Sequence, residues 1–235
     1  MQGIAARSRT LRLKVWGRNA CFTRPEMKVE RVSYDVMTPS AARGVLEAIL
    51  WKPAISWRIT QIDVLNPIKW ESVRRNEIGA VVSPSVDGIF IEDRRQQRAG
   101  LFLRDVAYTI HAFFEMTEKA GPADSLVKFE EMFLRRSEKG QCFHHPYMGC
   151  REFPADFTPV QEGSLLPGSL EKTAELGFGN PRDLGYMLYD IFHDHSVDIN
   201  EIHLCSDKCQ PRFFKAVLDN GKISIPSPAS LEVRG

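Results

Sequence analysis

The sequence predicts an α+β fold, in which strands and a few helices share a hydrophobic core. Several short segments alternate apolar and polar side chains, which is the pattern of half-buried strands. Two further segments repeat apolar residues at helical spacing. Hydrophobic residues make up 43% of the 235 residues, so the chain can bury a substantial core.

Two extended segments are expected near the N-terminus. In residues 11–23 the apolar side chains Leu11, Leu13 and Val15 alternate first with basic ones. Residues 27–36 alternate in a similar way. We therefore expect a strand and then a second extended segment that pairs nearby.

A helix and another strand are expected next. Thr38 or Ser40 can cap the N-terminus of the helix, and Pro39 is tolerated in its first turn. Pro53 prevents the helix from continuing. Residues 54–67 then alternate as a strand does.

The following strand and helix have clear boundaries. Residues 100–116 are rich in aromatic and β-branched side chains, which favours a strand. A helix follows, with Asp124 as its expected N-cap and Gly140 as its expected C-cap. Residues 150–160 form a last extended segment. The order of these elements is β-α-β-β-α-β, which is the ferredoxin-like (RRM-like) arrangement.

The chain is expected to form two domains. The ferredoxin-like domain covers residues 1–160 and contains an insertion at residues 68–98. This insertion is too long and too charged for a simple hairpin, so we expect an arm that is mobile or is ordered by a partner. Residues 161–235 are expected to form a small antiparallel β domain, with strands in 184–193 and 212–226. An Asn-Gly pair in the second of these suits a hairpin turn.

Charge is distributed unevenly along the chain. Residues 1–58 hold eleven basic and four acidic side chains, a net of +7, whereas the whole chain has a formal charge of +1. Clustered Lys and Arg residues are what phosphate contacts require. The pattern is compatible with one face for a polyanion and another for proteins, and equally with an ordinary solvated surface.

The sequence indicates a cytoplasmic protein without a metal. It has no apolar run long enough for a membrane helix and no signal-peptide pattern. The five cysteines are an odd number and are expected to be reduced thiols. Zinc is conceivable near Cys205 and Cys209, where His193, His195 and His203 also lie, but the spacing matches no paired-ligand motif. We therefore expect no metal and no other cofactor.

Common enzyme motifs are missing. The chain has no Walker loop, no G-x-G-x-x-G after a strand, no H-E-x-x-H and no G-x-S-x-G. A ferredoxin-like sheet alone does not determine a function.

Three segments carry a resemblance to a known family: WGRNACFTRPEMKVERVSYDVMTPSAARGVLEAILWKPAI, NPIKWESVRRNEIG and CFHHPYMGCREFPA. In this order they resemble the CRISPR-associated family-five proteins of subtype I-C, from about Leu11 to Pro226. The resemblance implies metal-independent cleavage of precursor CRISPR RNA at the repeat hairpin, through attack by a 2′-hydroxyl group. It also implies that the 5′ handle stays bound in an interference complex with backbone and large subunits. Alone, the protein is expected to be a monomer.

The resemblance implies a catalytic site that this sequence matches only in part. In the family's pattern a tyrosine stands near the end of the first helix, where this chain has Leu50. A Lys-His pair stands at the start of the second helix, where this chain has Lys128 and Phe129. Lys128 can still stabilise phosphate charge. His144 or His145 are candidates for the missing acid and base, because histidine titrates near neutral pH.

Of two further residues, only the first is an alternative. Tyr147 is another candidate for proton transfer. His111 lies within an aromatic strand and is expected to be packed or to lie on a sheet face.

Candidate RNA contacts lie around the first helix and the insertion. Trp51 offers a face for base stacking and Lys52 a phosphate contact. Trp51 filling the core is the alternative. A phosphate track is expected from these basic residues: Arg18, Arg24, Lys28, Arg31, Arg74 and Arg75.

Three functions remain open from the sequence. The first is a repeat-specific endoribonuclease that keeps its product. The second is a subunit that binds the handle but cleaves it slowly or not at all, because of the departures at Leu50 and Phe129. The third is a metal-dependent nuclease acting on DNA, which would need clustered carboxylates.

Overall fold

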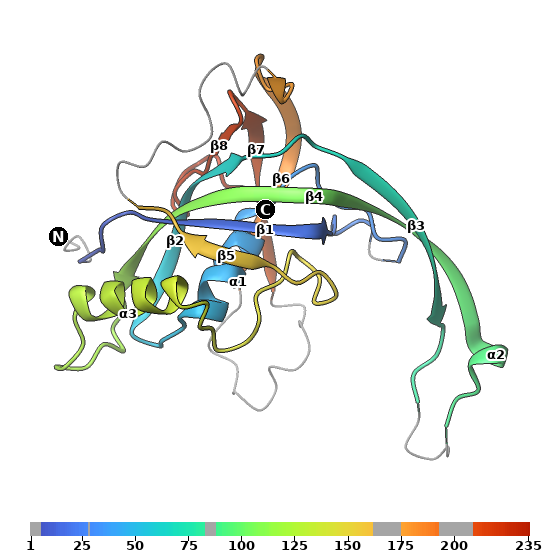
Figure 1. Cartoon of the computed structure of the whole chain (residues 1–235), viewed down its shortest axis with the longest axis horizontal. Coiled ribbons are helices and arrows are strands. Elements are labelled where there is room, and N and C mark those ends of the chain that lie inside the picture. Colours follow the sequence, from blue (N-terminus) through green and yellow to red (C-terminus); the bar gives the residue numbers. More distant parts are fainter. Residues whose placement is uncertain (1–5, 28, 83–87, 162–174, 193–208) are drawn as a thin grey trace.

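The computed structural model describes residues 6–27, 29–82, 88–161, 175–192 and 209–235. It contains a six-stranded antiparallel sheet, a two-stranded sheet and two helices of more than ten residues (Figure 1). The predicted α+β class is therefore confirmed. No helix among the described residues is long and apolar enough to cross a membrane.

The main sheet has the strand order β5-β1-β4-β2-β8, with β3 pairing on an extension of β4. Its strands are β1 (Leu11–Ala20), β2 (Ile55–Val64), β3 (Trp70–Ile78), β4 (Arg95–Met116), β5 (Asp156–Pro159) and β8 (Lys222–Ser224). All neighbouring strands are antiparallel. The chain passes through β1, α1, β2, β4, α3 and β5 in the order that the sequence predicted.

Helix α1 (Pro39–Ile49) begins where the sequence predicted. The Thr38 side chain caps it by accepting a hydrogen bond from the Ala41 backbone N–H at 3.2 Å. The helix ends at Leu50, whose N–H donates to the Leu46 carbonyl. Its apolar face is fully buried, so packing supports this short helix more than its own propensity does.

Helix α3 (Leu126–Glu138) begins one residue later than expected. Ser125, rather than Asp124, is the N-cap and accepts from the Lys128 backbone N–H at 3.3 Å. The Asp124 carboxylate is already bonded in the preceding turn, where the Gly121 N–H donates to it at 3.1 Å. Gly140 follows the C-terminal cap with a φ of +64°, a conformation that suits glycine.

An aromatic cluster joins α3 to the sheet. The Trp57 ring lies 5.2 Å from Phe114 and 4.9 Å from Phe133, measured between ring centroids. Phe129 lies 6.4 Å from Phe114 in an edge-on orientation. The first turn of α3 is thus fixed to the hydrophobic core by large buried rings.

The second extended segment near the N-terminus forms no regular strand among the described residues. Residues 27–36 make isolated bridges only, Thr23 with Ser33 and Val32 with Leu101. The expectation of a paired extended segment is therefore met only at two points. The segment lies across the end of β1, and the buried Ser33 hydroxyl accepts from the Phe22 N–H at 3.0 Å.

The insertion at residues 68–98 is a long hairpin, which corrects the expectation that it could not be one. β3 pairs with residues 95–103 of β4, and the four-residue helix α2 (Ile91–Arg94) lies on the return. Both faces of this ribbon are largely solvated, so its charged side chains need no burial. We call residues 70–82 and 88–103 the arm, and Figure 1 shows it extending away from the rest of the sheet.

The C-terminal strands form one small sheet and one edge of the main sheet. β6 (Arg182–Phe192) pairs with β7 (Gln210–Leu218), and β8 pairs with β2. The predicted turn between β7 and β8 is confirmed, because Asn220 and Gly221 have φ values of +50° and +75°. The division into two domains at residue 160 stays a prediction.

A half-buried ion pair connects α1 to β6. Arg43 donates to both carboxylate oxygens of Asp190, at 2.7 and 2.9 Å, and to Glu47 at 2.8 and 2.9 Å. The paired fork geometry fixes the orientation of the guanidinium group. The small sheet is therefore anchored to α1, the helix that precedes Trp51.

Gly149 allows the loop after α3 to lie directly on the end of β1. A Cβ atom at Gly149 would lie 2.1 Å from the Cys21 carbonyl oxygen, and its φ is +80°. We expect Gly149→Ala to lower the free energy of unfolding by about 3 kcal/mol or more. The control is Gly140→Ala, where φ is +64° but no atom lies within 4 Å, so the expected loss is about 1 kcal/mol. Urea unfolding of both variants measures the difference, and equal losses would contradict it.

Candidate functional site

The C-terminal end of α1 is held by groups from other elements. Three backbone carbonyls are bonded there: Ala48 by the Phe143 N–H, Ile49 by the Arg136 guanidinium and Leu50 by the Trp57 indole, at 2.8, 2.8 and 3.0 Å. Carbonyls at a helix end otherwise have no partner within the helix. The chain therefore leaves α1 in a fixed direction toward Trp51 and Lys52.

Trp51 projects from this end of the helix. Its side chain is 61% exposed, so the alternative that it fills the core is wrong. Lys52 beside it is half-buried. An exposed aromatic ring next to a cation is the combination that binds an unpaired base and its phosphate.

Lys128 lies in the first turn of α3, close to the same rim. Its Nζ donates to Asp124 Oδ1 at 3.0 Å and to the Ala123 carbonyl at 3.2 Å. The Gly121 N–H lowers the pKa of the Asp124 carboxyl most, and Lys128 and the charge of Lys52 lower it further. Two lysines thus act on one half-buried carboxylate. We call Trp51, Lys52, Asp124 and Lys128 the lysine rim.

The two candidate histidines lie on the loop after α3. His144 and His145 are both exposed. The His144 ring is stacked 6.3 Å from Tyr147, and its Nδ1 lies 3.3 Å from the His145 carbonyl oxygen. The Phe143 N–H ties this loop to α1.

The structure does not bring these histidines into contact with Lys128. Lys128 is in the first turn of α3, whereas His144 and His145 follow its other end. A helix of this length spans roughly 20 Å. Within the described parts of the chain, no hydrogen bond or ring contact joins either histidine to the lysine rim.

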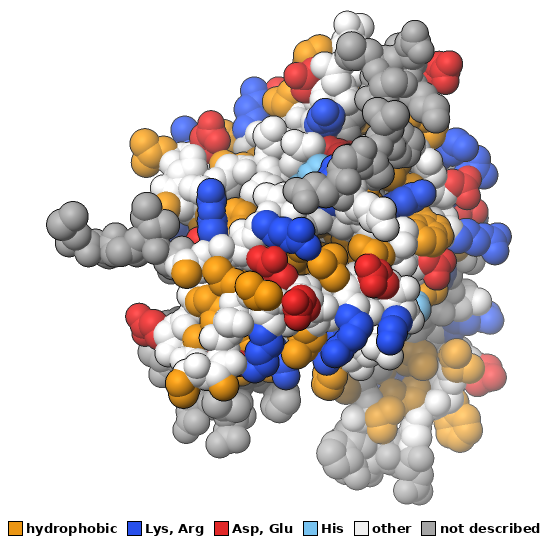
Figure 2. All heavy atoms as spheres, turned by 60° about the vertical axis from the view of Figure 1, so that its left-hand side comes forward, with side chains coloured by type: hydrophobic (Ala, Val, Ile, Leu, Met, Phe, Trp, Pro, Cys, Tyr) orange, Lys and Arg blue, Asp and Glu red, His pale blue; other side chains and the backbone are white. Residues whose placement is uncertain are grey.

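The predicted phosphate track divides into paired and unpaired arginines. Arg24 pairs with Asp35 at 3.2 Å, whereas Arg31 and Arg75 both pair with Glu152. Two others, Arg18 and Arg74, are exposed and form no ion pair with any described residue, and Lys28 lies outside the described residues. Figure 2 shows Lys and Arg side chains interspersed with acidic ones on the face it presents, not gathered into one patch.

Sequence reasoning missed two clusters whose members are distant in the chain. His111 was expected to be packed, and its Nε2 lies 2.7 Å from the buried Asp63 carboxylate. Cys21 and Cys150 lie together beside Arg31. Neither cluster has a local sequence signal, because its residues come from different strands and loops.

A large pocket lies away from the lysine rim. It has a volume of about 930 Å³ and opens between β8 and the small sheet, where Tyr186, Lys215, Lys222 and Arg234 are among the lining residues. None of the predicted catalytic residues lines it. Its size alone therefore does not identify a reaction site.

Most of the possible zinc ligands lie outside the described residues. Of that set only Cys209 is described, because His193, His195, His203 and Cys205 lie outside the described residues. Among described residues, no group of three or more His, Cys, Asp or Glu side chains is placed to hold a metal ion.

Comparison with known proteins identifies the family. The model of the family described as CRISPR-associated protein (Cas_Cas5) matches residues 10–226. The chain belongs to this family. The family assignment made from the three sequence segments is confirmed.

Two relatives of this Cas5-family chain carry the name CRISPR pre-crRNA endoribonuclease Cas5d. The protein from Mannheimia succiniciproducens is 51% identical over 95% of this chain and 98% of its own length. The one from Thermus thermophilus is 47% identical over 92% of this chain and 91% of its own length.

Two solved structures share the fold of this Cas5-family chain. One is titled as a CRISPR-associated protein, with a TM-score of 0.65 and 22% identity over 99% of this chain and all of that one. The other is a functionally uncharacterized protein of Streptococcus mutans, with a TM-score of 0.65 and 21% identity over the same shares. At this identity the likeness shows the fold alone.

The two departures from the family's catalytic pattern are core residues in this Cas5-family chain. Leu50 is fully buried and Phe129 is 2% exposed. Both side chains therefore fill the space between α1, α3 and the sheet and cannot reach a bound molecule. Lys128, by contrast, keeps an exposed ammonium group.

Restoring the family's pattern should destabilise this fold. Phe129→His places a polar ring in an apolar cluster and should cost about 2–3 kcal/mol in the free energy of unfolding. Leu50→Tyr overfills the core and should cost about 1–3 kcal/mol. Val127→His is the matched control, because Val127 is 63% exposed and should change stability by less than about 0.5 kcal/mol. Urea unfolding measures all three variants. An unchanged free energy of unfolding in Phe129→His and Leu50→Tyr would contradict the packing described.

Proposed function

We propose that this protein cleaves precursor CRISPR RNA and keeps the 5′ handle bound. The observation that carries this is the identity of 51% and 47%, over more than nine-tenths of both chains, to proteins named pre-crRNA endoribonucleases. The lysine rim supports it, because an exposed tryptophan and two lysines suit a single-stranded nucleic acid.

The proposed reaction is metal-independent attack of a ribose 2′-hydroxyl on the adjacent phosphate. The O2′–P bond forms, the bond to the 5′-oxygen breaks, and the products carry a 2′,3′-cyclic phosphate and a 5′-hydroxyl. The phosphorane gains negative charge as it forms, and a fixed cation stabilises that charge. Lys128 serves this role, since its exposed Nζ is already held by the Asp124 carboxylate at 3.0 Å.

Proton transfer is assigned to His144 and His145 as part of the proposal. One imidazole would accept the 2′-hydroxyl proton and the other would protonate the leaving oxygen. Their support is the hydrogen bond from the Phe143 N–H to the Ala48 carbonyl, which ties their loop to α1, the helix just before Trp51 and Lys52. Because all three side chains must act on the same phosphate and the histidines do not contact Lys128, the proposal requires the loop after α3 to approach Lys128 when the RNA binds.

A handle-binding subunit with slow or absent cleavage is the second candidate. The burial of Leu50 and Phe129 favours it, because neither position offers a proton donor or acceptor. Both candidates bind the handle, and only a cleavage assay separates them.

The protein is further proposed to assemble with backbone and large subunits of a type I-C interference complex in the cytoplasm. Exposed apolar side chains near the end of the arm support a protein contact. They are Ile78, Val81, Val82, Phe90 and Ile91. A cluster of exposed apolar groups of this kind marks an interaction surface.

Cleavage of labelled repeat RNA in EDTA tests the proposed function. We expect the all-RNA substrate to yield a cyclic phosphate and a substrate with 2′-deoxyribose at the scissile nucleotide to stay intact. Lys128→Ala should slow cleavage about 100-fold, as loss of one charge-stabilising donor does. Lys139→Ala, an exposed lysine just after the same helix, is the matched control and should cleave normally.

Tight binding of both substrates without cleavage would instead establish the handle-binding subunit. Equal slowing of cleavage by Lys128→Ala and Lys139→Ala would show that Lys128 has no specific role in the catalytic site. Substitution of His144 and His145 by alanine, one at a time, then shows whether either imidazole transfers a proton.

The two neighbouring arginines of the arm should differ in their effect on RNA binding. Arg74 is exposed and unpaired with any described residue, so Arg74→Ala should lower the slope of log affinity against log salt by about one unit. Arg75 pairs with Glu152 and Glu77, so Arg75→Ala should change this slope less. Fluorescence anisotropy with handle RNA at several salt concentrations measures both. An unchanged slope in Arg74→Ala would assign this part of the arm to protein contacts.

A further inference from the structure

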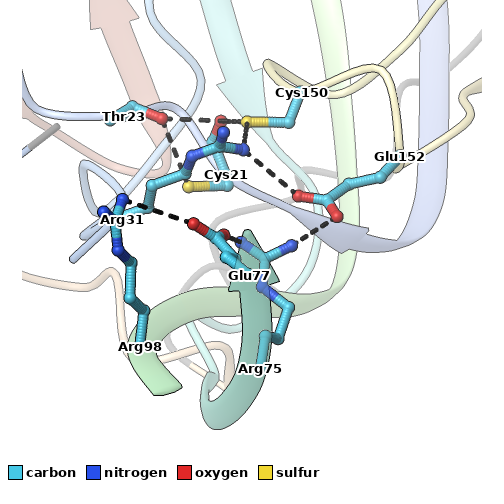
Figure 3. Close-up of polar contacts among 8 residues, drawn as sticks. All are labelled: Cys21, Thr23, Arg31, Arg75, Glu77, Arg98, Cys150 and Glu152. Carbon is cyan, nitrogen blue, oxygen red and sulfur yellow. Dashed lines mark hydrogen bonds and ion pairs between the residues drawn. The ribbon is translucent and has the colours of Figure 1, made fainter. Parts of the chain in front are cut away.

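Two cysteines that are distant in the sequence lie side by side at the end of β1. Cys150 Sγ lies 3.5 Å from the Cys21 carbonyl oxygen. The Thr23 hydroxyl lies between the two thiols, 3.5 Å from Cys21 Sγ and 3.8 Å from Cys150 Sγ (Figure 3). Cys21 follows the end of β1, and Cys150 lies on the loop after α3.

The backbone around the pair fixes their separation. The Cys21 N–H donates to the Met148 carbonyl at 3.0 Å. Gly149 then lies so close to the Cys21 carbonyl that no side chain fits at that position. A glycine at this point brings the next residue, Cys150, against Cys21. The contact is thus built into the fold and does not depend on a chance rotamer.

The surroundings of Cys150 favour its thiolate form. Arg31 Nη1 lies 3.8 Å from Cys150 Sγ, and it also pairs with Glu152 at 3.5 Å. The hydrogen bond from the Cys21 thiol lowers the pKa of Cys150 most, and Thr23 and Arg31 lower it further, to about 6, despite the opposing effect of burial. The same hydrogen bond, together with burial, raises the pKa of Cys21.

The two thiols differ in access. Cys21 is fully buried, whereas Cys150 is half-buried and lies on the loop after α3. A thiolate within reach of solvent, beside a second thiol that is sheltered, is the arrangement of a redox-sensitive pair. Structural thiols in an apolar core are inert by comparison.

We propose that Cys150 is an oxidation-sensitive thiol that forms a disulfide with Cys21 when a hydroperoxide reaches the loop. The Cys150 thiolate attacks one peroxide oxygen, so that an S–O bond forms, the O–O bond breaks and the leaving oxygen takes up a proton to become an alcohol or water. The Cys21 sulfur then attacks the sulfenic sulfur of Cys150. The S–S bond forms, and hydroxide departs with the Cys21 proton as water.

The two oxidation steps balance in electrons. The two thiols together lose two electrons, and the hydroperoxide gains them. Thiol reductants reverse the change by exchange at the disulfide. No metal or other cofactor is needed, so the purified chain is sufficient for a test.

Oxidation would change a charge network that reaches the arm. Arg31 and Arg75 both contact Glu152, Arg75 also pairs with Glu77 at 3.5 Å, and Glu77 pairs with Arg98 at 3.4 Å (Figure 3). A disulfide removes the negative charge of the Cys150 thiolate from beside Arg31. Arg31 is then left with the Glu152 carboxylate, which also pairs with Arg75 of the arm.

Peptide mapping after oxidation tests the pair directly. The whole protein is treated with hydrogen peroxide, the remaining thiols are blocked, and trypsin is added without reductant. Cys21 lies in the tryptic peptide of residues 19–28 and Cys150 in that of residues 140–151. We expect a cross-linked species of these two peptides that disappears on reduction.

Matched variants identify the partner, because residues 140–151 also contain Cys142. The cross-link should persist in Cys142→Ser and be lost in Cys150→Ser and Cys21→Ser. Loss in Cys142→Ser, or the appearance of sulfinic acid at Cys150 with no cross-link in the wild-type protein, would overturn the proposal.

The rate of alkylation measures thiolate character without relying on a cysteine variant. Between pH 7 and pH 8 the Cys150 rate in the folded protein should rise less than about twofold, since a thiol with a lowered pKa is already ionised. In the urea-unfolded chain the same residue should show a roughly eightfold rise, as an ordinary thiol does. Arg31→Gln should steepen the rise in the folded protein. Equal rises in folded and unfolded protein would contradict a reactive thiolate at Cys150.

Discussion

The length of β4 (Arg95–Met116), which pairs with three other strands, is the constraint on which the rest of the structure depends. One half of this strand pairs with β1 and β2 in the sheet, and the other half pairs with β3 in the arm. Between the two, Asp105 adopts a φ of +53°, and Asn66 donates to its carbonyl at 2.7 Å. A strand that changes partners without ending joins the arm directly to the core sheet.

At the lysine rim, buried core residues are adjacent in the sequence to exposed candidate RNA-binding residues. α1 and α3 meet the sheet through buried rings and aliphatic groups, and these include Leu50 and Phe129. Residues immediately beside them in the chain, Trp51 and Lys128, point outward. Because consecutive positions on a helix or an extended chain face different directions, a core residue and a functional residue can be neighbours without sharing an environment.

The sequence predicted local features well and long-range contacts poorly. Thr38, Pro39 and Pro53 determine where α1 begins and ends through backbone chemistry alone, and the Asn220-Gly221 turn has the same local cause. The arm was misjudged because a solvated two-stranded ribbon has no apolar face to produce a pattern. Within the candidate site, Lys128 was found through the family resemblance. The Cys21–Cys150 contact joins positions 129 residues apart, so no window of sequence contains it.

The lengths of the edge strands bear on how the sheet behaves in a crowded solution. β5 has four residues and β8 three, so each of these outermost strands offers only a few backbone groups for further pairing. A third free edge, that of β3, has nine residues that carry two arginines and two glutamates. Short edges and charged edges both discourage a second sheet from adding to the first. Resistance to edge-to-edge aggregation therefore follows from the short and charged edge strands of this sheet.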